Sequence, residues 1–126
     1  MVMEYCEQDI DYLLKNQNRP WSLSEVKCLM RQLLKAVDYL HERWMIHRDL
    51  KTSNLLYTNK GQLKVGDFGL VRLMGYPYRR ITTNVVTLWY RPPELLLGST
   101  TYSFALDIWY NCSLTLNYQV CGLYIG

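Results

Sequence analysis

The sequence predicts an α+β fold that is mainly helical, and three observations support this class. Apolar residues between positions 22 and 43 recur every three or four residues, which is typical of a helix with one buried face. Two short apolar runs around a glycine, at positions 54–67, indicate a β-hairpin. The chain has 126 residues, the length of one domain with its own core.

The elements before the hairpin can be assigned from local signals. MVME at the N-terminus is interpreted as the end of a strand, and DIDYLLKN at positions 9–16 as a short helix. Ser22 and Glu25 fit a capping box, in which each side chain satisfies an amide of the first helical turn. The long helix is therefore expected from Ser22 to Arg43.

The C-terminal residues follow a different pattern. No charged residue occurs from Ile108 to Gly126, and apolar and polar residues alternate there. The alternating apolar positions are Cys112, Leu114, Leu116, Tyr118 and Val120. Period two is typical of a strand, so a strand is predicted, of the uncharged kind that pairs with other chains.

Composition excludes several classes of function. Fourteen Lys and Arg against eleven Asp and Glu give a net charge of +3, too small to predict a nucleic-acid partner. The N-terminus is no secretory signal, and no apolar run is long enough to span a membrane. The four cysteines show no metal or disulfide spacing and are Cys6, Cys28, Cys112 and Cys121. We expect reduced thiols, Cys28 in the core, and an intracellular protein of the nucleus or cytoplasm.

Four polar residues carry the candidate chemistry. Asp49, Lys51 and Asn54 lie in the loop IHRDLKTSN, and Asp67 lies in GDFG, where a hairpin would fold it back beside the other three. Carboxylate and amide oxygens are ligands that Mg²⁺ prefers, so Asn54 and Asp67 fit a magnesium site. Asp49 is then left to orient a hydroxyl and Lys51 to neutralise a phosphate, as phosphoryl transfer requires.

Each motif alone also has a purely structural explanation, because His-Arg-Asp and DFG both occur in ordinary turns. Their order changes this weighting: HRDLKTSN is followed by DFGL and then by VVTLWYRPPE. Together with VMEYCEQD and VKCL, these segments resemble the eukaryotic protein kinases, specifically the cyclin-dependent kinases of the branch with cyclin-dependent kinase 10 and the PITSLRE kinases. The resemblance covers residues 1–109 and implies a protein-kinase-like α+β fold, here a truncated, mainly helical C-lobe with a short β-hairpin.

The resemblance implies that the chain uses ATP and Mg²⁺. The backbone of Glu4 and Cys6 would bind adenine beside Met3, which matches the gatekeeper. Asp9 would lie near the ribose, and Leu56 would form the floor under the base.

The resemblance also implies roles around the catalytic loop. Asp49 matches the catalytic base, Lys51 the phosphate-contacting lysine, and Asn54 and Asp67 the magnesium ligands. Thr87 resembles the threonine that links a later loop to Asp49 and Lys51. Val86 and Arg91 match positions behind the preference for proline after the phosphorylated residue.

The segment from Asp67 to Glu94 resembles an activation segment. Thr82 matches the activating phosphothreonine, with Thr83 as the neighbouring alternative, and Arg48 and Arg72 would grip its phosphate. For Arg79 and Arg80 a solvated basic patch and a substrate or phosphate role both stay open. His47 is expected to pack in the core rather than act chemically.

We expect parts of the family's machinery to be absent here. The glycine-rich loop, the strand lysine, the helix glutamate and the helix that docks cyclin all precede the hinge in the family. Residues 110–126 are expected to be a divergent, non-kinase tail in place of the buried central helix, although Asp107 would still cap amides of the catalytic loop. The apolar faces of Leu33, Leu34, Leu95 and Leu96 would then lose a packing partner.

The expected function follows from these points. By family, the chain is a cyclin-dependent serine/threonine kinase that acts on Ser or Thr followed by Pro, with cyclin and protein substrates as partners and no nucleic acid or membrane. The 126-residue chain alone is expected to be inactive. The alternative is a catalytically dead splice or gene-model fragment that acts at most as an interaction module.

Overall fold

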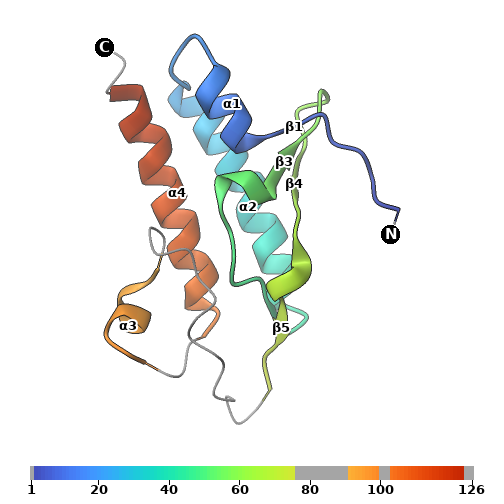
Figure 1. Cartoon of the computed structure of the whole chain (residues 1–126), viewed down its shortest axis with the longest axis vertical. Helices are drawn as coiled ribbons and strands as arrows, with labels where there is room; N and C mark the ends of the chain where they lie inside the picture. Colours follow the sequence, from blue (N-terminus) through green and yellow to red (C-terminus); the bar gives the residue numbers. More distant parts are fainter. Residues whose placement is uncertain (1, 76–90, 100–102, 124–126) are drawn as a thin grey trace.

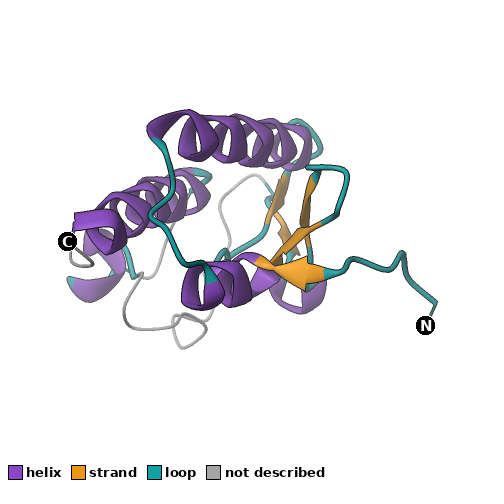
Figure 2. Ribbon diagram, turned by 90° about the horizontal axis from the view of Figure 1, so that it is seen from above, coloured by secondary structure: helices purple, strands orange, loops and turns teal. Residues whose placement is uncertain are grey.

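A computed structural model describes residues 2–75, 91–99 and 103–123. The helices are α1 (Ile10–Asn16), α2 (Leu23–His41), α3 (Pro93–Leu96) and α4 (Ala105–Leu123). The strands form two antiparallel sheets. The first contains β1 (Gln8–Asp9), β3 (Leu55–Tyr57) and β4 (Leu63–Val65), in the order β1-β3-β4. The second contains β2 (Met45–Ile46) and β5 (Arg72–Leu73). The helices α2 and α4 pack together (Figure 1), and the strands gather on one side of the helices (Figure 2). The predicted α+β class is confirmed.

The long helix α2 begins where its capping signal predicts. The Ser22 backbone N–H donates to Glu25 Oε2 at 2.8 Å, and the Glu25 N–H donates back to Ser22 Oγ at 3.3 Å. Its buried face consists of Val26, Leu29, Met30, Leu33, Val37 and Leu40. The prediction is confirmed, with the helix ending at His41 rather than Arg43.

The hairpin is also confirmed. β3 and β4 pair in the register Leu55–Val65, and Gly61 occupies the left-handed φ of +77° that the turn requires. Gln32 of α2 binds the turn and the start of β4, because its Nε2 donates to the Gly61 carbonyl at 3.1 Å and its Oε1 accepts from the Leu63 amide at 2.9 Å. The sheet is thereby fixed to the long helix.

Two local predictions are wrong. No strand begins at the N-terminus, since the described residues 2–6 have no regular structure and the first strand is Gln8–Asp9. Cys28 does not lie in the core but is exposed on α2. A small apolar residue on a helix can occupy either face, so its type alone did not fix its position.

The predicted C-terminal strand is wrong as well, because α4 is a helix that extends to Leu123. Leu106, Tyr110 and Leu114 lie four residues apart and are 0, 1 and 0% exposed. This spacing places them on one helical face, and that face packs on α2. A helix satisfies its own backbone hydrogen bonds, whereas a strand would need a neighbouring strand.

The expected loss of packing is therefore wrong for half of the residues concerned. Leu33 and Leu95 are 0 and 6% exposed, since α4 provides part of the core. Leu34 and Leu96 are 46 and 60% exposed. Within the ranges that the structure describes, no helix has the length and apolarity to cross a bilayer.

Candidate active site

The loop after β2 is buried and is anchored by one carboxylate of α4. The amide of His47 donates to Asp107 Oδ2 at 2.9 Å, and the amide of Arg48 donates to Oδ1 at 3.0 Å. Asp107 is fully buried. The prediction that Asp107 caps this loop is confirmed, and Arg48 is held at a left-handed φ of +70° that non-glycine residues rarely adopt.

His47 packs in the core, as predicted, and joins the loop to the end of the hairpin. It is 0% exposed, and its ring meets the Phe68 ring edge-on at 5.3 Å. The Asp49 amide points at Nδ1 (3.4 Å), which leaves the ring proton on Nε2 to donate to the Gly66 carbonyl at 3.0 Å. His47 therefore positions the loop and the segment before Asp67 relative to each other.

Asp49, Lys51 and Asn54 form one hydrogen-bonded group. Lys51 Nζ lies 2.9 Å from Asp49 Oδ2, and Asn54 Nδ2 donates to the same oxygen at 3.1 Å and to the Asp49 carbonyl at 2.9 Å. Both donors thus converge on one carboxylate oxygen. Among the described residues the other oxygen, Oδ1, accepts no hydrogen bond.

The hairpin brings Asp67 to the same place. The Gly66 amide donates to the Asn54 carbonyl at 2.8 Å, which ties the residue before Asp67 to the loop. A Cβ at Gly66 would meet the Leu56 side chain at 3.2 Å, so this close approach favours glycine. Asp67 itself has a left-handed φ of +54° and is exposed. The predicted juxtaposition is confirmed at the backbone level.

The donor set fits a magnesium ion. Asn54 commits its Nδ2 to Asp49, so its amide oxygen remains as a ligand. Asp67 follows Gly66, whose amide binds the Asn54 carbonyl, and offers an exposed carboxylate. In the part of the chain that the structure describes, no group of three or more His, Cys, Asp or Glu could hold a metal. Two protein oxygens fit Mg²⁺, which keeps water and phosphate oxygens as its other ligands and supplies charge neutralisation when bound.

A cavity of about 710 Å³ lies next to Asp67. Four residues predicted to surround adenine, namely Met3, Glu4, Cys6 and Leu56, line it. Glu4 also forms an ion pair with Lys64, which lines the same cavity.

Asp9, predicted near the ribose, is not among the residues that line this cavity. Its carboxylate instead caps α1 by accepting from the Tyr12 amide at 2.7 Å.

The two predicted phosphate-gripping arginines are brought near each other by strand pairing. β2 and β5 pair Ile46 with Arg72, two residues from Arg48. Arg48 Nε donates to the Leu70 carbonyl at 2.6 Å, whereas Arg72 is exposed. Arg91 is partly buried. Six further residues lie outside the described part of the chain, and these are Arg79, Arg80, Thr82, Thr83, Val86 and Thr87.

Three contacts to this loop were missed from the sequence. His41 Nε2 lies 2.9 Å from Asp107 Oδ2, and Tyr110 Oη donates to the Arg48 carbonyl at 3.3 Å. Thr52 Oγ1 donates to Asp11 at 3.1 Å. The hydrogen bond from Lys15 lowers the pKa of Asp11 most, and the hydrogen bond from Thr52 lowers it further. On a helix, residues 107 and 110 lie on the same face. Because a strand was predicted for this segment, their shared position was not recognised from the sequence.

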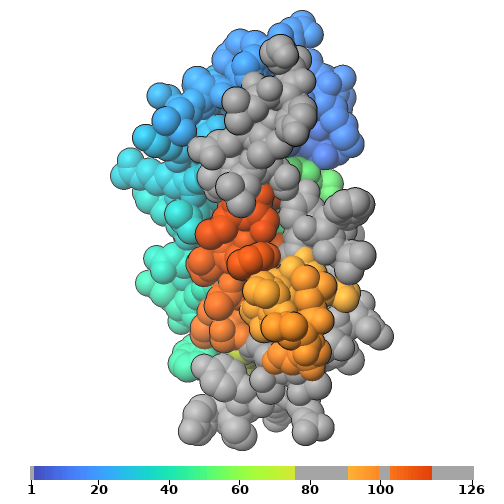
Figure 3. Space-filling view, turned by 90° about the vertical axis from the view of Figure 1, so that its left-hand side faces the viewer, coloured from blue at the N-terminus to red at the C-terminus, as the bar shows by residue number. Residues whose placement is uncertain are grey.

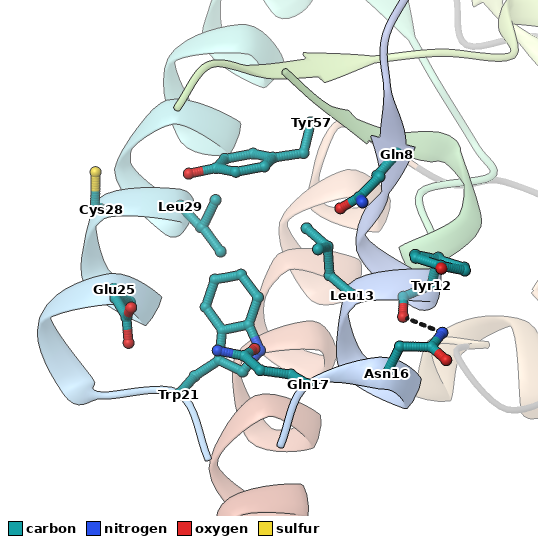
Figure 4. A pocket seen from close by; sticks show the side chains of 10 residues that line it. All are labelled: Gln8, Tyr12, Leu13, Asn16, Gln17, Trp21, Glu25, Cys28, Leu29 and Tyr57. Carbon is teal, nitrogen blue, oxygen red and sulfur yellow. Dashed lines mark hydrogen bonds between the residues drawn. The ribbon is translucent and has the colours of Figure 1, made fainter. Parts of the chain in front are cut away.

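A second cavity, of about 580 Å³, lies between α1, α2 and the sheet (Figure 4). Leu13, Trp21, Leu29 and Tyr57 are among its lining residues, and none of the loop residues described above is. Glu25 at its edge serves the cap of α2. We therefore assign a structural role to the part of the molecule around this cavity.

Comparisons with known proteins agree with this geometry. The protein kinase domain family matches residues 1–122. Over 109 residues, or 86% of this chain, the identity is 60% to probable cyclin-dependent kinase 10 of Dictyostelium discoideum and 59% to cyclin-dependent kinase G-1 of Oryza sativa subsp. indica. The chain spans 30% and 16% of the length of these two relatives.

A solved structure gives the same result. The crystal structure of the yeast RNA Pol II CTD kinase CTDK-1 complex contains a chain that matches with a TM-score of 0.88 and 44% identity. The match covers 94% of this chain and 38% of that one. The chain therefore belongs to the protein kinase family and, within it, to the cyclin-dependent kinases.

Proposed function

We propose that this chain carries the catalytic loop of a cyclin-dependent serine/threonine kinase, which transfers the γ-phosphate of ATP to Ser or Thr followed by Pro. The observation that carries the proposal is the convergence of Lys51 and Asn54 on one oxygen of Asp49, at 2.9 and 3.1 Å. Two donors hold that carboxylate in a fixed orientation, so its other oxygen can accept the proton of a substrate hydroxyl.

The remaining roles follow from charge and ligand type. Lys51 neutralises the transferred phosphate, and Asn54 and Asp67 hold Mg²⁺ beside the cavity that takes ATP. Thr82 is proposed as the regulatory phosphosite and cyclin as the partner, which the family membership and the names of the relatives support. The solved neighbour is itself described as a complex.

For the 126-residue chain alone we propose no measurable turnover. The sequence contains no G-x-G-x-x-G motif that could cover the phosphates. Met3, at the edge of the nucleotide cavity, is 70% exposed. The second candidate is a catalytically dead chain that acts at most as an interaction module.

A chimera tests the proposed chemistry separately from the activity of the isolated chain. The 109 residues of this chain that match the Dictyostelium relative would replace the corresponding segment of that protein, and transfer from labelled ATP to a Ser-Pro peptide would be measured. We expect Asp49→Asn to lower kcat by about 10²–10⁴, the range for loss of a general base. Asp38→Asn, on the exposed face of α2, is the matched control.

Three outcomes would count against these proposals. Equal kcat for the Asp49→Asn and Asp38→Asn chimeras would remove Asp49 from the chemistry. Equal use of a Ser-Ala peptide would remove the preference for proline. Turnover by the isolated chain that depends on Asp49 would contradict its inactivity.

A further inference from the structure

A hydrogen bond between two side chains joins α1 to the catalytic loop. Thr52 Oγ1 donates to Asp11 Oδ1 at 3.1 Å, although the two residues are 41 positions apart in the sequence. Thr52 is 8% exposed and begins the 3₁₀ turn η1 (Thr52–Asn54), which packs on α1. Figure 3 shows α1 in blue, with green atoms of the chain after residue 50 directly beside it.

The turn η1 has a group assigned to phosphoryl transfer at each end. Lys51 precedes the turn as its N-cap, and Asn54 is its last residue. The Asn54 amide donates to the Lys51 carbonyl at 2.9 Å, and the Leu55 amide donates to the Thr52 carbonyl. These backbone hydrogen bonds make the turn one short unit, so any rotation of it moves Lys51 and Asn54 together.

Contacts from the hairpin and from α1 set the orientation of this unit. The Gly66 amide of the hairpin segment donates to the Asn54 carbonyl at 2.8 Å, which holds the end of the turn. Asp11 holds its beginning through the Thr52 hydroxyl. With both ends held, the turn cannot pivot. Without the contact to α1, it could rotate about Asn54 and change the directions of both functional side chains.

Asp11 is well suited to hold the turn, because its carboxylate is itself fixed and charged. Its other oxygen, Oδ2, accepts from Lys15 Nζ at 2.5 Å, one helical turn further along α1. The hydrogen bond from Lys15 is the main cause that holds the pKa of Asp11 below its usual value, so the group is ionised at neutral pH. A hydrogen bond from a hydroxyl to a carboxylate is shorter and stronger than one between neutral groups.

We propose that Asp11 and Thr52 are positioning residues for phosphoryl transfer: their hydrogen bond fixes η1 so that Lys51 and Asn54 both reach Asp49 Oδ2. The inference rests on the proposed function. It adds a residue of α1 to the groups on which the catalytic loop depends.

Replacing the hydroxyl tests the inference in the chimera described above. Thr52→Val keeps the branched shape and removes the donor. We expect kcat to fall about tenfold, within the range for residues that orient a ligand from behind, and the KM for ATP to change by less than about twofold. Thr52→Ser, which keeps the hydroxyl, should restore kcat to within about twofold of the unmodified chimera.

Thr58→Val is the matched control for a general loss of stability. Thr58 is also 8% exposed, and its Oγ1 accepts from the Gln62 amide at 3.3 Å in the turn of the hairpin. Thermal unfolding should show similar losses for Thr52→Val and Thr58→Val, whereas only Thr52→Val should lower kcat. An equal fall of kcat in both variants would reduce the role of Thr52 to stability and overturn the inference.

Variants of α1 test the other partner. Asp11→Ala should lower kcat as much as Thr52→Val, and the double variant should lose no more than either single one, because both remove the same hydrogen bond. Lys15→Met removes the ion pair but leaves the acceptor of Thr52, and its kcat should stay within about twofold of the unmodified chimera. Losses that multiply in the double variant would contradict a shared role.

Hydrogen exchange on the 126-residue chain tests the geometry without any turnover. The amides of Asn54 and Leu55 should exchange faster in Thr52→Val than in Thr52→Ser, and at unchanged rates in Thr58→Val. Equal exchange in all three variants would overturn the inference even if the chimera were inactive.

The two proposals fail in different ways. If Asp49→Asn leaves kcat of the chimera unchanged, the proposed function is wrong. If Asp49→Asn lowers kcat while Thr52→Val and Asp11→Ala leave it unchanged, the proposed function stands and the positioning role is wrong.

Discussion

The two sides of the candidate active site differ in how they are held. On one side, His47, Arg48 and Asp49 are 0, 1 and 8% exposed and are tied to α4 through Asp107. On the other side, Met3 and Tyr5 are 70 and 79% exposed, and an ion pair between Glu4 and Lys64 joins this segment to the sheet. Buried contacts and Asp107 therefore hold the loop that contains Asp49, whereas an exposed ion pair holds the segment around Glu4.

The largest expected effect comes from removing the anchor on the supported side. Asp107→Ala leaves the buried amides of His47 and Arg48 without an acceptor, at about 1–3 kcal/mol each. We expect the free energy of unfolding to fall by about 2–6 kcal/mol, measured by urea denaturation. The control Asp38→Ala, on the exposed face of α2, should change it by less than about 0.5 kcal/mol. Equal losses would show that the loop does not depend on this carboxylate.

The next effect compares two adjacent leucines of α2. Leu33 is 0% exposed in the same core cluster as Ile46 and Leu50, which flank the loop, and Leu34 is 46% exposed. Leu33→Ala should cost about 2–5 kcal/mol because it opens a cavity, and Leu34→Ala less than about 1 kcal/mol. Hydrogen exchange should become faster at the amides of His47 and Arg48 and stay unchanged at Met3. Protection at His47 that survives Leu33→Ala would separate the loop from the core.

A smaller effect is expected from the cap of α2 in acid. The hydrogen bond from Arg19, followed by those from Ser22, lowers the pKa of Glu25 from 4.5 to about 2. The stabilisation is fully present above pH 4.5 and is lost as the pH falls through about 2. In thermal unfolding between pH 6 and pH 2, the advantage of the unmodified chain over Glu25→Gln should shrink across this window.

Glu42→Gln, on an exposed residue after α2, serves as the control for this pH series. A difference between the unmodified chain and Glu25→Gln that stays constant down to pH 2 would contradict the role of the charge in the cap.

The smallest effect is expected on the weakly supported side of the site. The side chain of Glu4 is 66% exposed, so its ion pair with Lys64 is screened by solvent and should contribute at most about 1 kcal/mol. A double-mutant cycle with Glu4→Gln and Lys64→Met measures this coupling. A coupling above 2 kcal/mol would show that this wall is held as firmly as the loop.

Local signals predicted the fold well wherever the cause was local. Ser22 and Glu25 define the start of α2 because a capping box needs only residues three apart. Gly61 marks the turn of the hairpin for a similar reason. The contact between Asn54 and Gly66 follows from that hairpin.

The failures share a different cause. The alternation after Ile108 fits a strand, but the chain also carries Leu106, Tyr110 and Leu114 at helical spacing, and the surface of α2 selects between these two patterns. β2 and β5 contain two residues each, which is too short for a periodic signal. His41 was missed because its partner Asp107 lies 66 residues away.

The position of Asp107 along the chain has a consequence for folding during synthesis. His47 and Arg48 leave the ribosome about 60 residues before the carboxylate that binds their amides. Until α4 emerges and docks, the Arg48 amide lacks its acceptor on Asp107 and the Arg48 carbonyl lacks its donor on Tyr110, so the loop acquires these contacts late. Full assembly of the loop therefore requires the downstream helix, and a nascent chain halted before residue 107 would contain Asp49, Lys51 and Asn54 without this anchor.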